Sequence, residues 1–113
     1  MDTQQLTANI AQAITDFNNN RFQILQLAFQ NGGQNEVTRL EQEYDALRDA
    51  YFEIIQAQLD KNNHLYDQLT TATNTETDKL KTSIAQLNNI NNIINLLTSV
   101  VNLIGRSIIT LGI

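Results

Sequence analysis

The last third of the chain carries a pattern of apolar residues that a helix buries along one side. Successive apolar positions there are separated by three or four residues without interruption, which is the spacing of a buried helical seam. These positions are Leu87, Ile90, Ile94, Leu97, Val101, Ile104, Ile108 and Leu111. The opposite face is polar and includes Asn95 and Asn102. We therefore expect a long amphipathic helix whose apolar face is covered by the rest of the chain.

The first part of the chain predicts a helix over about residues 3–30, because its apolar residues fall on one broad face at helical spacing. These residues are Leu6, Ile10, Ala13, Ile14, Phe17, Ile24, Leu25, Ala28 and Phe29. Asparagine is a poor helix former, since its amide competes for backbone hydrogen bonds. We nevertheless expect the helix to continue, bent, through the run at residues 18–20. The run Asn31-Gly32-Gly33 then predicts a clear break.

The middle of the chain predicts a second long helix over about residues 36–72. Its apolar stripe shifts by one residue near Ile54 and Ile55, which indicates a stutter in the repeat. The threonine-rich run at residues 70–75 is interpreted as a turn. Glu76 and Asp78 suit the first turn of a helix, where the macrodipole favours negative charge. A third helix is therefore predicted over about residues 76–111.

Three long helices joined by short links predict the fold class. The chain has no proline, and proline would interrupt long helices. At 1.5 Å per residue, the second and third helices are each about 55 Å long and the first is about 42 Å long. The first helix then leaves a two-helix overhang near residues 63–86, where both long helices are polar. We therefore predict one all-α domain over residues 1–113, an elongated antiparallel three-helix bundle with coiled-coil-like packing.

The charge and composition of the chain exclude several classes of function. The formal net charge is −5, whereas a protein that binds nucleic acid needs a basic surface that displaces counterions. Binding to an anionic membrane surface is disfavoured for the same reason. The absence of cysteine excludes disulfides and thiolate metal sites. The first residues lack the basic and apolar regions of a signal peptide, so we expect a cytoplasmic location.

No constellation of residues in the sequence predicts catalysis. The single histidine, His64, has Asp60 and Asp67 on the same face of a predicted helix. We interpret this trio as solvated surface, because three ligands on one helix do not surround a metal ion. A row of carboxylates on the same helix is interpreted likewise, and consists of Glu41, Asp45, Asp49 and Glu53. No phosphate-binding loop, nucleophile elbow or metalloprotease motif is present. We therefore predict no enzymatic activity, no catalytic or metal-binding residue and no cofactor.

The apolar face of the C-terminal helix is wider than a two-helix seam needs. Part of it is predicted to be an interaction surface, made of Ile93, Leu96, Val100, Leu103, Ile104 and Ile108. We predict a non-enzymatic structural or protein-interaction module that self-associates through this helix, its partner being a second copy or another helical protein. Asn88, Asn91, Asn92 and Asn95 beside the seam either fix the register of such a contact or fill an ordinary polar face. Both interpretations remain open at this stage.

The alternative prediction is a membrane-associated or pore-forming protein that uses residues 90–113. The length of this stretch is near that of a membrane span. However, Asn95, Asn102 and Arg106 are costly in hydrocarbon unless they line an aqueous lumen. No lysine or aromatic belt flanks the stretch. A membrane role is therefore the second choice.

Overall fold

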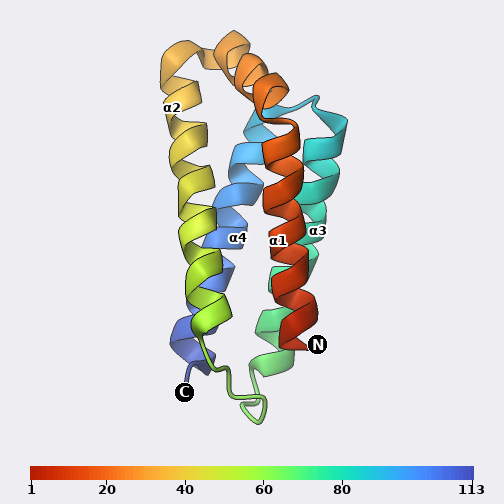
Figure 1. Cartoon of the computed structure of the whole chain (residues 1–113), viewed down its shortest axis with the longest axis vertical. Helices are drawn as coiled ribbons and strands as arrows, with labels where there is room; N and C mark the ends of the chain where they lie inside the picture. Colours follow the sequence, from red (N-terminus) through yellow and green to blue (C-terminus); the bar gives the residue numbers. More distant parts are fainter.

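The protein is an all-helical bundle, as a computed structural model of residues 1–113 describes it (Figure 1). The predicted all-α class is confirmed, but the predicted count of three helices is wrong, because the chain forms four. Their bounds are α1 Thr3–Asn19, α2 Arg21–Gln56, α3 Tyr66–Gln86 and α4 Ile90–Leu111. The bundle measures 46 × 21 × 18 Å along its principal axes.

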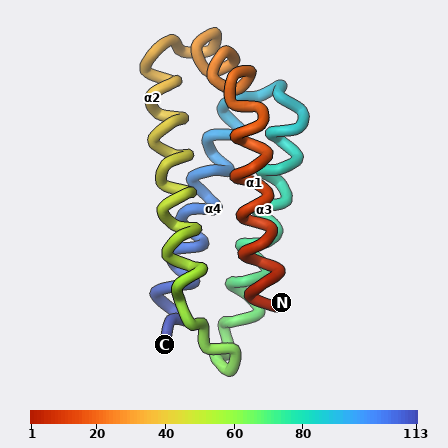
Figure 2. Tube along the Cα trace, viewed as in Figure 1, coloured from red at the N-terminus to blue at the C-terminus, as the bar shows by residue number.

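The helices form a four-cornered arrangement in which some neighbours run in the same direction. Helices α1 and α2 pack together, as do α3 and α4, and in each of these pairs the helices run in opposite directions. The pairs α1–α3 and α2–α4 also pack together, and these run in the same direction (Figure 2). Consecutive helices α2 and α3 do not pack extensively on each other. Helix α4 therefore has α2 on one side and α3 on the other.

The predicted first helix is too long, because α1 ends at Asn19. The side-chain amide of Asn20 donates to the backbone carbonyl of Asp16 at 2.8 Å. The backbone N–H of Asn20 also donates to Asp16 O and Phe17 O, at 3.2 and 3.1 Å, and the non-helical φ of −110° and ψ of 13° at Asn20 end α1. The next segment, residues 21–31, tilts across the upper end of the bundle (Figure 1).

The predicted break at the glycine pair is confirmed as a sharp kink inside α2. Gly32 has φ −152° and ψ 17°, and Gly33 has φ 69° and ψ −155°, so neither residue is helical. The backbone of Gly33 lies in a region that is nearly restricted to glycine. Helix α2 therefore consists of two rods, residues 21–31 across the end of the bundle and residues 34–56 along it.

The predicted second helix, over residues 36–72, is also wrong in extent, because a loop at residues 57–65 interrupts it. The Asp60 carboxylate accepts from the backbone N–H of Asn62 at 3.0 Å, a turn that competes with a helix. The loop is fastened to the end of the chain by two backbone hydrogen bonds. The N–H of Asp60 donates to Leu111 O at 2.7 Å, and the N–H of Ile113 donates to Gln58 O at 2.9 Å.

The threonine-rich run is helical, so the predicted turn at residues 70–75 is wrong. Thr70, Thr73 and Thr77 lie at 0% exposure on the inner face of α3, between apolar residues at helical spacing. Each hydroxyl donates at 2.7 Å to the carbonyl four residues earlier. These bonds satisfy the buried hydroxyls, so threonine can replace an apolar residue in this core.

The predicted third helix, over residues 76–111, is split at residues 87–89. Leu87 takes a left-handed conformation with φ 51° and ends α3. The side chain of Asn89 accepts from the backbone N–H of Asn92 at 3.1 Å and caps α4. The apolar spacing shortens just before Ile90, and this irregularity coincides with the break.

The core runs the length of the bundle and is centred on α4. Its buried seam consists of Ile90, Ile93, Ile94, Leu97, Val100, Ile104 and Leu111. Between α1 and α2, the rings of Phe17 and Tyr44 stack with centroids 4.1 Å apart. Arg21 and Arg48 lie near the Tyr44 ring, at 5.5 and 6.0 Å from its centroid, which adds a cation–π contribution.

Candidate functional site

The predicted interaction surface of α4 is divided between the core and the edges of the helix. Ile93, Val100 and Ile104 have 0% exposure inside a single chain. Leu96, Leu103 and Ile108 are half-buried. The width of the apolar face is accounted for within one chain, because α4 packs against both α2 and α3. Only the half-buried residues are available for contact with another molecule.

The solvent-facing side of α4 carries a second row of residues with heptad-like spacing. We name this row the outer seam, and it consists of Asn91, Asn95, Thr98, Asn102, Gly105 and Ile109. Its steps of four and three residues place it along one line of the helix. The three asparagines and Ile109 are exposed, and the other two residues are half-buried. No member of the outer seam is charged.

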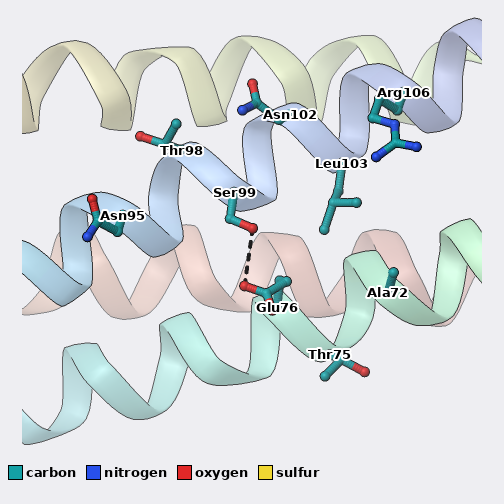
Figure 3. Close-up of a pocket in the computed structure, with 9 residues that line it drawn as sticks. All are labelled: Ala72, Thr75, Glu76, Asn95, Thr98, Ser99, Asn102, Leu103 and Arg106. Atoms are coloured by element: carbon teal, nitrogen blue, oxygen red, sulfur yellow. Dashed lines mark hydrogen bonds between the residues drawn. The ribbon is translucent and has the colours of Figure 1, made fainter.

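A shallow groove of about 670 Å³ follows the boundary between α3 and α4 (Figure 3). The Ser99 hydroxyl donates to Glu76 Oε2 at 3.2 Å across this boundary, and Lys79 approaches the other carboxylate oxygen at 3.2 Å. Figure 3 shows Ser99 pointing toward Glu76 of α3, while Thr98 and Asn102 point away from α3. The polar groups therefore do not converge on one point, as a binding site for a small ligand requires. The lining residues are Ala72, Thr75, Glu76, Asn95, Thr98, Ser99, Asn102, Leu103 and Arg106.

The titratable residues that the sequence singled out are not brought together. His64 is exposed in the α2–α3 loop and not on a helix face. Asp67 lies in the first turn of α3, 3.5 Å from the N-terminal amino group. In the acidic row of α2, Glu41 approaches Arg21 at 3.8 Å. No group of three or more His, Asp or Glu side chains is arranged to hold a metal ion.

The upper end of the bundle carries an apolar surface that sequence reasoning missed. Phe22 and Phe29 are 69% and 60% exposed on the outer side of residues 21–31. We predicted Phe29 on the buried face, and this is wrong, because the buried residues Phe17, Ile24 and Ala28 continue one line at helical spacing and Phe29 lies one residue off that line. A groove of about 410 Å³ lies beside these rings, and no charged residue lines it. Its lining residues are Phe22, Leu25, Gln26, Phe29, Gln30 and Val37.

Helix α4 is the one helix long and apolar enough to cross a membrane. Length and composition alone are weak evidence of a span, because the central helix of a water-soluble bundle has the same properties. The inward side of α4 forms the core, and its outward side carries Asn95, Asn102 and Arg106.

Comparison of the chain with known protein families, with curated proteins and with solved structures finds no significant match.

Proposed function

We propose that the protein is a non-enzymatic helical module that self-associates through the outer side of α4. The observation that carries this proposal is the near absence of charge on the outer side of α4, where Arg106 is the single charged residue and no member of the outer seam is charged. Charged residues are depleted at the centres of protein interfaces relative to the remaining surface. A solvent-facing helix of a monomer would ordinarily carry charges on its outer side.

The distribution of charge in the chain favours contact at this helix. All 12 Asp and Glu residues lie at or before Asp78, and α4 contains one charged residue, Arg106. Two copies of a chain with net charge −5 repel each other through most of their surfaces. The outer side of α4 offers a contact without repulsion between carboxylates.

The chemistry of the outer seam suits contact with an identical helix. Each asparagine side chain has a carbonyl that accepts and an amide that donates, so an asparagine from one copy satisfies that of another. Asparagines at such positions specify register and oligomeric state at some cost in stability. Leu96, Leu103 and Ile108 are half-buried at the edges of α4 and would add apolar contact area. A helix of another protein with a similar face is the second possible partner.

Sedimentation equilibrium over a range of protein concentrations tests the proposal. The test variant is Asn95→Asp/Asn102→Asp, which keeps the side-chain size and adds two negative charges to the outer seam. The control, Gln4→Glu/Gln5→Glu, adds the same charge in the exposed first turn of α1, a helix that does not pack extensively on α4. We expect the mean mass of wild type and control to rise with concentration, and that of the test variant to remain monomeric.

Two results would contradict self-association through the outer seam. One is a wild-type protein that stays monomeric at the highest concentration. The other is a test variant that associates as readily as the control. Because Asn95 and Asn102 are exposed, their substitution should change the free energy of unfolding by no more than about 0.5 kcal/mol. Loss of association would therefore report the contact and not the fold.

A membrane role for residues 90–113 is the second candidate, favoured by the length and apolar character of α4. It requires α4 to leave the core, and Asn95 and Asn102 to enter hydrocarbon or line a pore. The variant Asn95→Asp/Asn102→Asp tests it too, since a carboxylate at the centre of a span costs about 2.5–3.5 kcal/mol. Flotation with vesicles that this variant loses and the α1 control keeps would support insertion of α4.

A further inference from the structure

The loop at residues 57–65 is the covalent link between two helical hairpins, α1–α2 and α3–α4, and it lies at the lower end of the bundle (Figure 1). The two hairpins pack on each other through the same-direction pairs α1–α3 and α2–α4. Helices α2 and α3, which the loop joins, do not pack extensively on each other. The contacts between the hairpins would therefore be the same if the second hairpin came from another copy of the chain.

The sequence of this loop is compatible with a helix as well as with a turn. The loop contains neither glycine nor proline, the two residues that are least favourable inside a helix. Helical spacing continues through it in steps of four and three residues, at Ile55, Leu59, Asn62, Tyr66 and Leu69. A helix that ran from α2 into α3 without a break would therefore keep these residues on one side.

The turn conformation depends on a few hydrogen bonds that a helix can replace. The Asp60 carboxylate accepts from the backbone N–H of Asn62 at 3.0 Å, and the side-chain carbonyl of Asn63 accepts from the N–H of Leu65 at 2.9 Å. Such side-chain bonds offer the backbone an alternative to a helix. In a continuous helix the same N–H groups would donate to carbonyls one turn earlier, so the backbone of the loop would keep its hydrogen bonds.

We propose that this loop is a hinge through which two copies of the chain exchange their C-terminal hairpins. In the exchanged dimer, residues 34–86 of each copy form one continuous helix, and each α3–α4 hairpin packs against α1 and α2 of the other copy. The partner is a second copy, because the surfaces that meet are those that already fit each other within one chain. The exchange does not use the outer seam, so this proposal is independent of self-association through α4.

The region beside the hinge also favours the exchanged dimer. Phe52 and Ile55, in the last turns of α2, are 50% and 46% exposed in the single chain. In a dimer with two-fold symmetry, the two hinge segments approach each other at the axis. Contact between the two copies there would cover Ile55, which the closed loop leaves half-exposed.

Refolding from denaturant at high protein concentration, followed by dilution and size-exclusion chromatography, tests the proposal. Exchange requires the two hairpins to separate, so we expect the dimer to form during refolding and to persist after dilution. A dimer held by the outer seam would instead dissociate on dilution by mass action. Exchange should also occur in Asn95→Asp/Asn102→Asp, in which the outer seam carries two added charges.

A cross-link shows directly whether hairpins have been exchanged. The chain has no cysteine, so Asn9→Cys/Asn74→Cys introduces the only thiols, one on α1 and one on α3. The native side chains are close, because the amide of Asn9 donates to Asn74 Oδ1 at 2.8 Å. A short bis-maleimide should join the two thiols within one chain in the monomer. In the exchanged dimer it should join two chains, and a denaturing gel separates these products.

Two hinge variants should shift the yield of dimer in opposite directions. Asp60→Ala/Asn63→Ala removes both side-chain turns, and each dimer opens two loops, so we expect its dimerisation constant to exceed that of wild type by about tenfold or more. Lys61→Gly/Asn62→Gly should lower the constant, because glycine weakens the continuous helix. The control is Asn35→Ala/Asp49→Ala, which makes the same replacements as the first variant at exposed positions of the rod at residues 34–56. It should dimerise as wild type does.

Four results would overturn the proposal. The first is a wild-type chain that refolds only to monomers at every concentration. The second is a dimer in which the bis-maleimide joins thiols of one chain, which would assign the dimer to a surface contact such as the outer seam. The third is an Asp60→Ala/Asn63→Ala variant that dimerises no more than its control, and the fourth is a glycine variant that dimerises as readily as wild type. The cross-link is made with the natural loop, so it decides the question even if a hinge variant folds poorly.

Discussion

Replacement of Gly33 by alanine is expected to destabilise the protein through the backbone alone. Gly33 combines a φ of 69° with a ψ of −155°, a region that side chains with a Cβ atom rarely adopt. A Cβ atom built at Gly33 meets no neighbouring atom within 4 Å. The substitution therefore creates no steric overlap with the rest of the fold and isolates the conformational term.

The magnitude follows from two opposing contributions. Strain of this kind costs about 1–3 kcal/mol in the folded chain. Alanine restricts the conformations of the unfolded chain more than glycine does, and this stabilises the folded state by about 0.4–1 kcal/mol. We expect Gly33→Ala to lower the free energy of unfolding by about 1–2 kcal/mol. The corresponding fall in Tm is about 4–12 °C for a chain of this size.

Gly105 is a matched control, because a Cβ atom there also meets nothing within 4 Å but the backbone is helical. Gly105→Ala should raise the free energy of unfolding by about 1 kcal/mol, the difference in helix propensity. Urea denaturation followed by the helical circular dichroism signal measures both variants, and the m-values should match that of wild type. A low protein concentration keeps contacts at the outer seam from contributing. If Gly33→Ala were as stable as wild type, the kink could not have the backbone described above.

Two further predictions concern parts of the fold that were not correctly predicted from the sequence, namely the threonine-rich run of α3 and the contact between the α2–α3 loop and the end of the chain. Thr73→Asp should lower the free energy of unfolding by about 3–5 kcal/mol in denaturation experiments, because it places an unpaired charge in the core. The control is Thr71→Asp at an exposed position, which should change the free energy of unfolding by less than about 0.5 kcal/mol. Equal effects of the two substitutions would mean that this run has no buried face. In Gly112→Ala, the new Cβ would lie 2.5 Å from a backbone oxygen of the last turn of α4. Amide hydrogen exchange at Asp60 and Ile113 should then accelerate by about tenfold, because their hydrogen bonds loosen; unchanged exchange would show that the end of the chain is held in another way.

The helical class and part of the buried side of α4 could be predicted because the three-and-four spacing persists from Ile90 to Leu111. Val101 and Ile108 of the predicted seam are only half-buried, whereas Ile93 and Val100, which were predicted to face a partner, are fully buried. The kink at Gly32 and Gly33 could also be predicted, because a pair of glycines is in itself a local signal for a break in a helix. The α2–α3 loop was not, because it contains neither glycine nor proline. Its position depends on a side-chain turn at Asp60 and on pairing with the distant end of the chain, which no local pattern reports.

The threonine-rich run at residues 70–75 was wrongly predicted as a turn, because the conformational preference of threonine favours a turn whereas the burial of these side chains favours a helix. Threonine favours turns when exposed, but Thr73 and Thr77 repeat at core spacing, and their hydroxyls bond to the helix itself. Phe29 was placed on the buried face because that face was drawn too broadly. The buried residues Phe17, Ile24 and Ala28 continue one line at helical spacing across the break, and Phe29 lies one residue off it.

The same-direction pairing of α1 with α3, and of α2 with α4, has a consequence for the order of folding. The α1–α2 and α3–α4 hairpins form from residues close in the chain, because their connections span only residues 20–33 and 87–89. The other two pairings close long loops, and such contacts form late and slow the folding of a helical protein. A ribosome-bound chain that ended before Ile90 would hold the inner faces of α2 and α3 open to water. Nascent chains are therefore most prone to aggregate just before α4 leaves the ribosome.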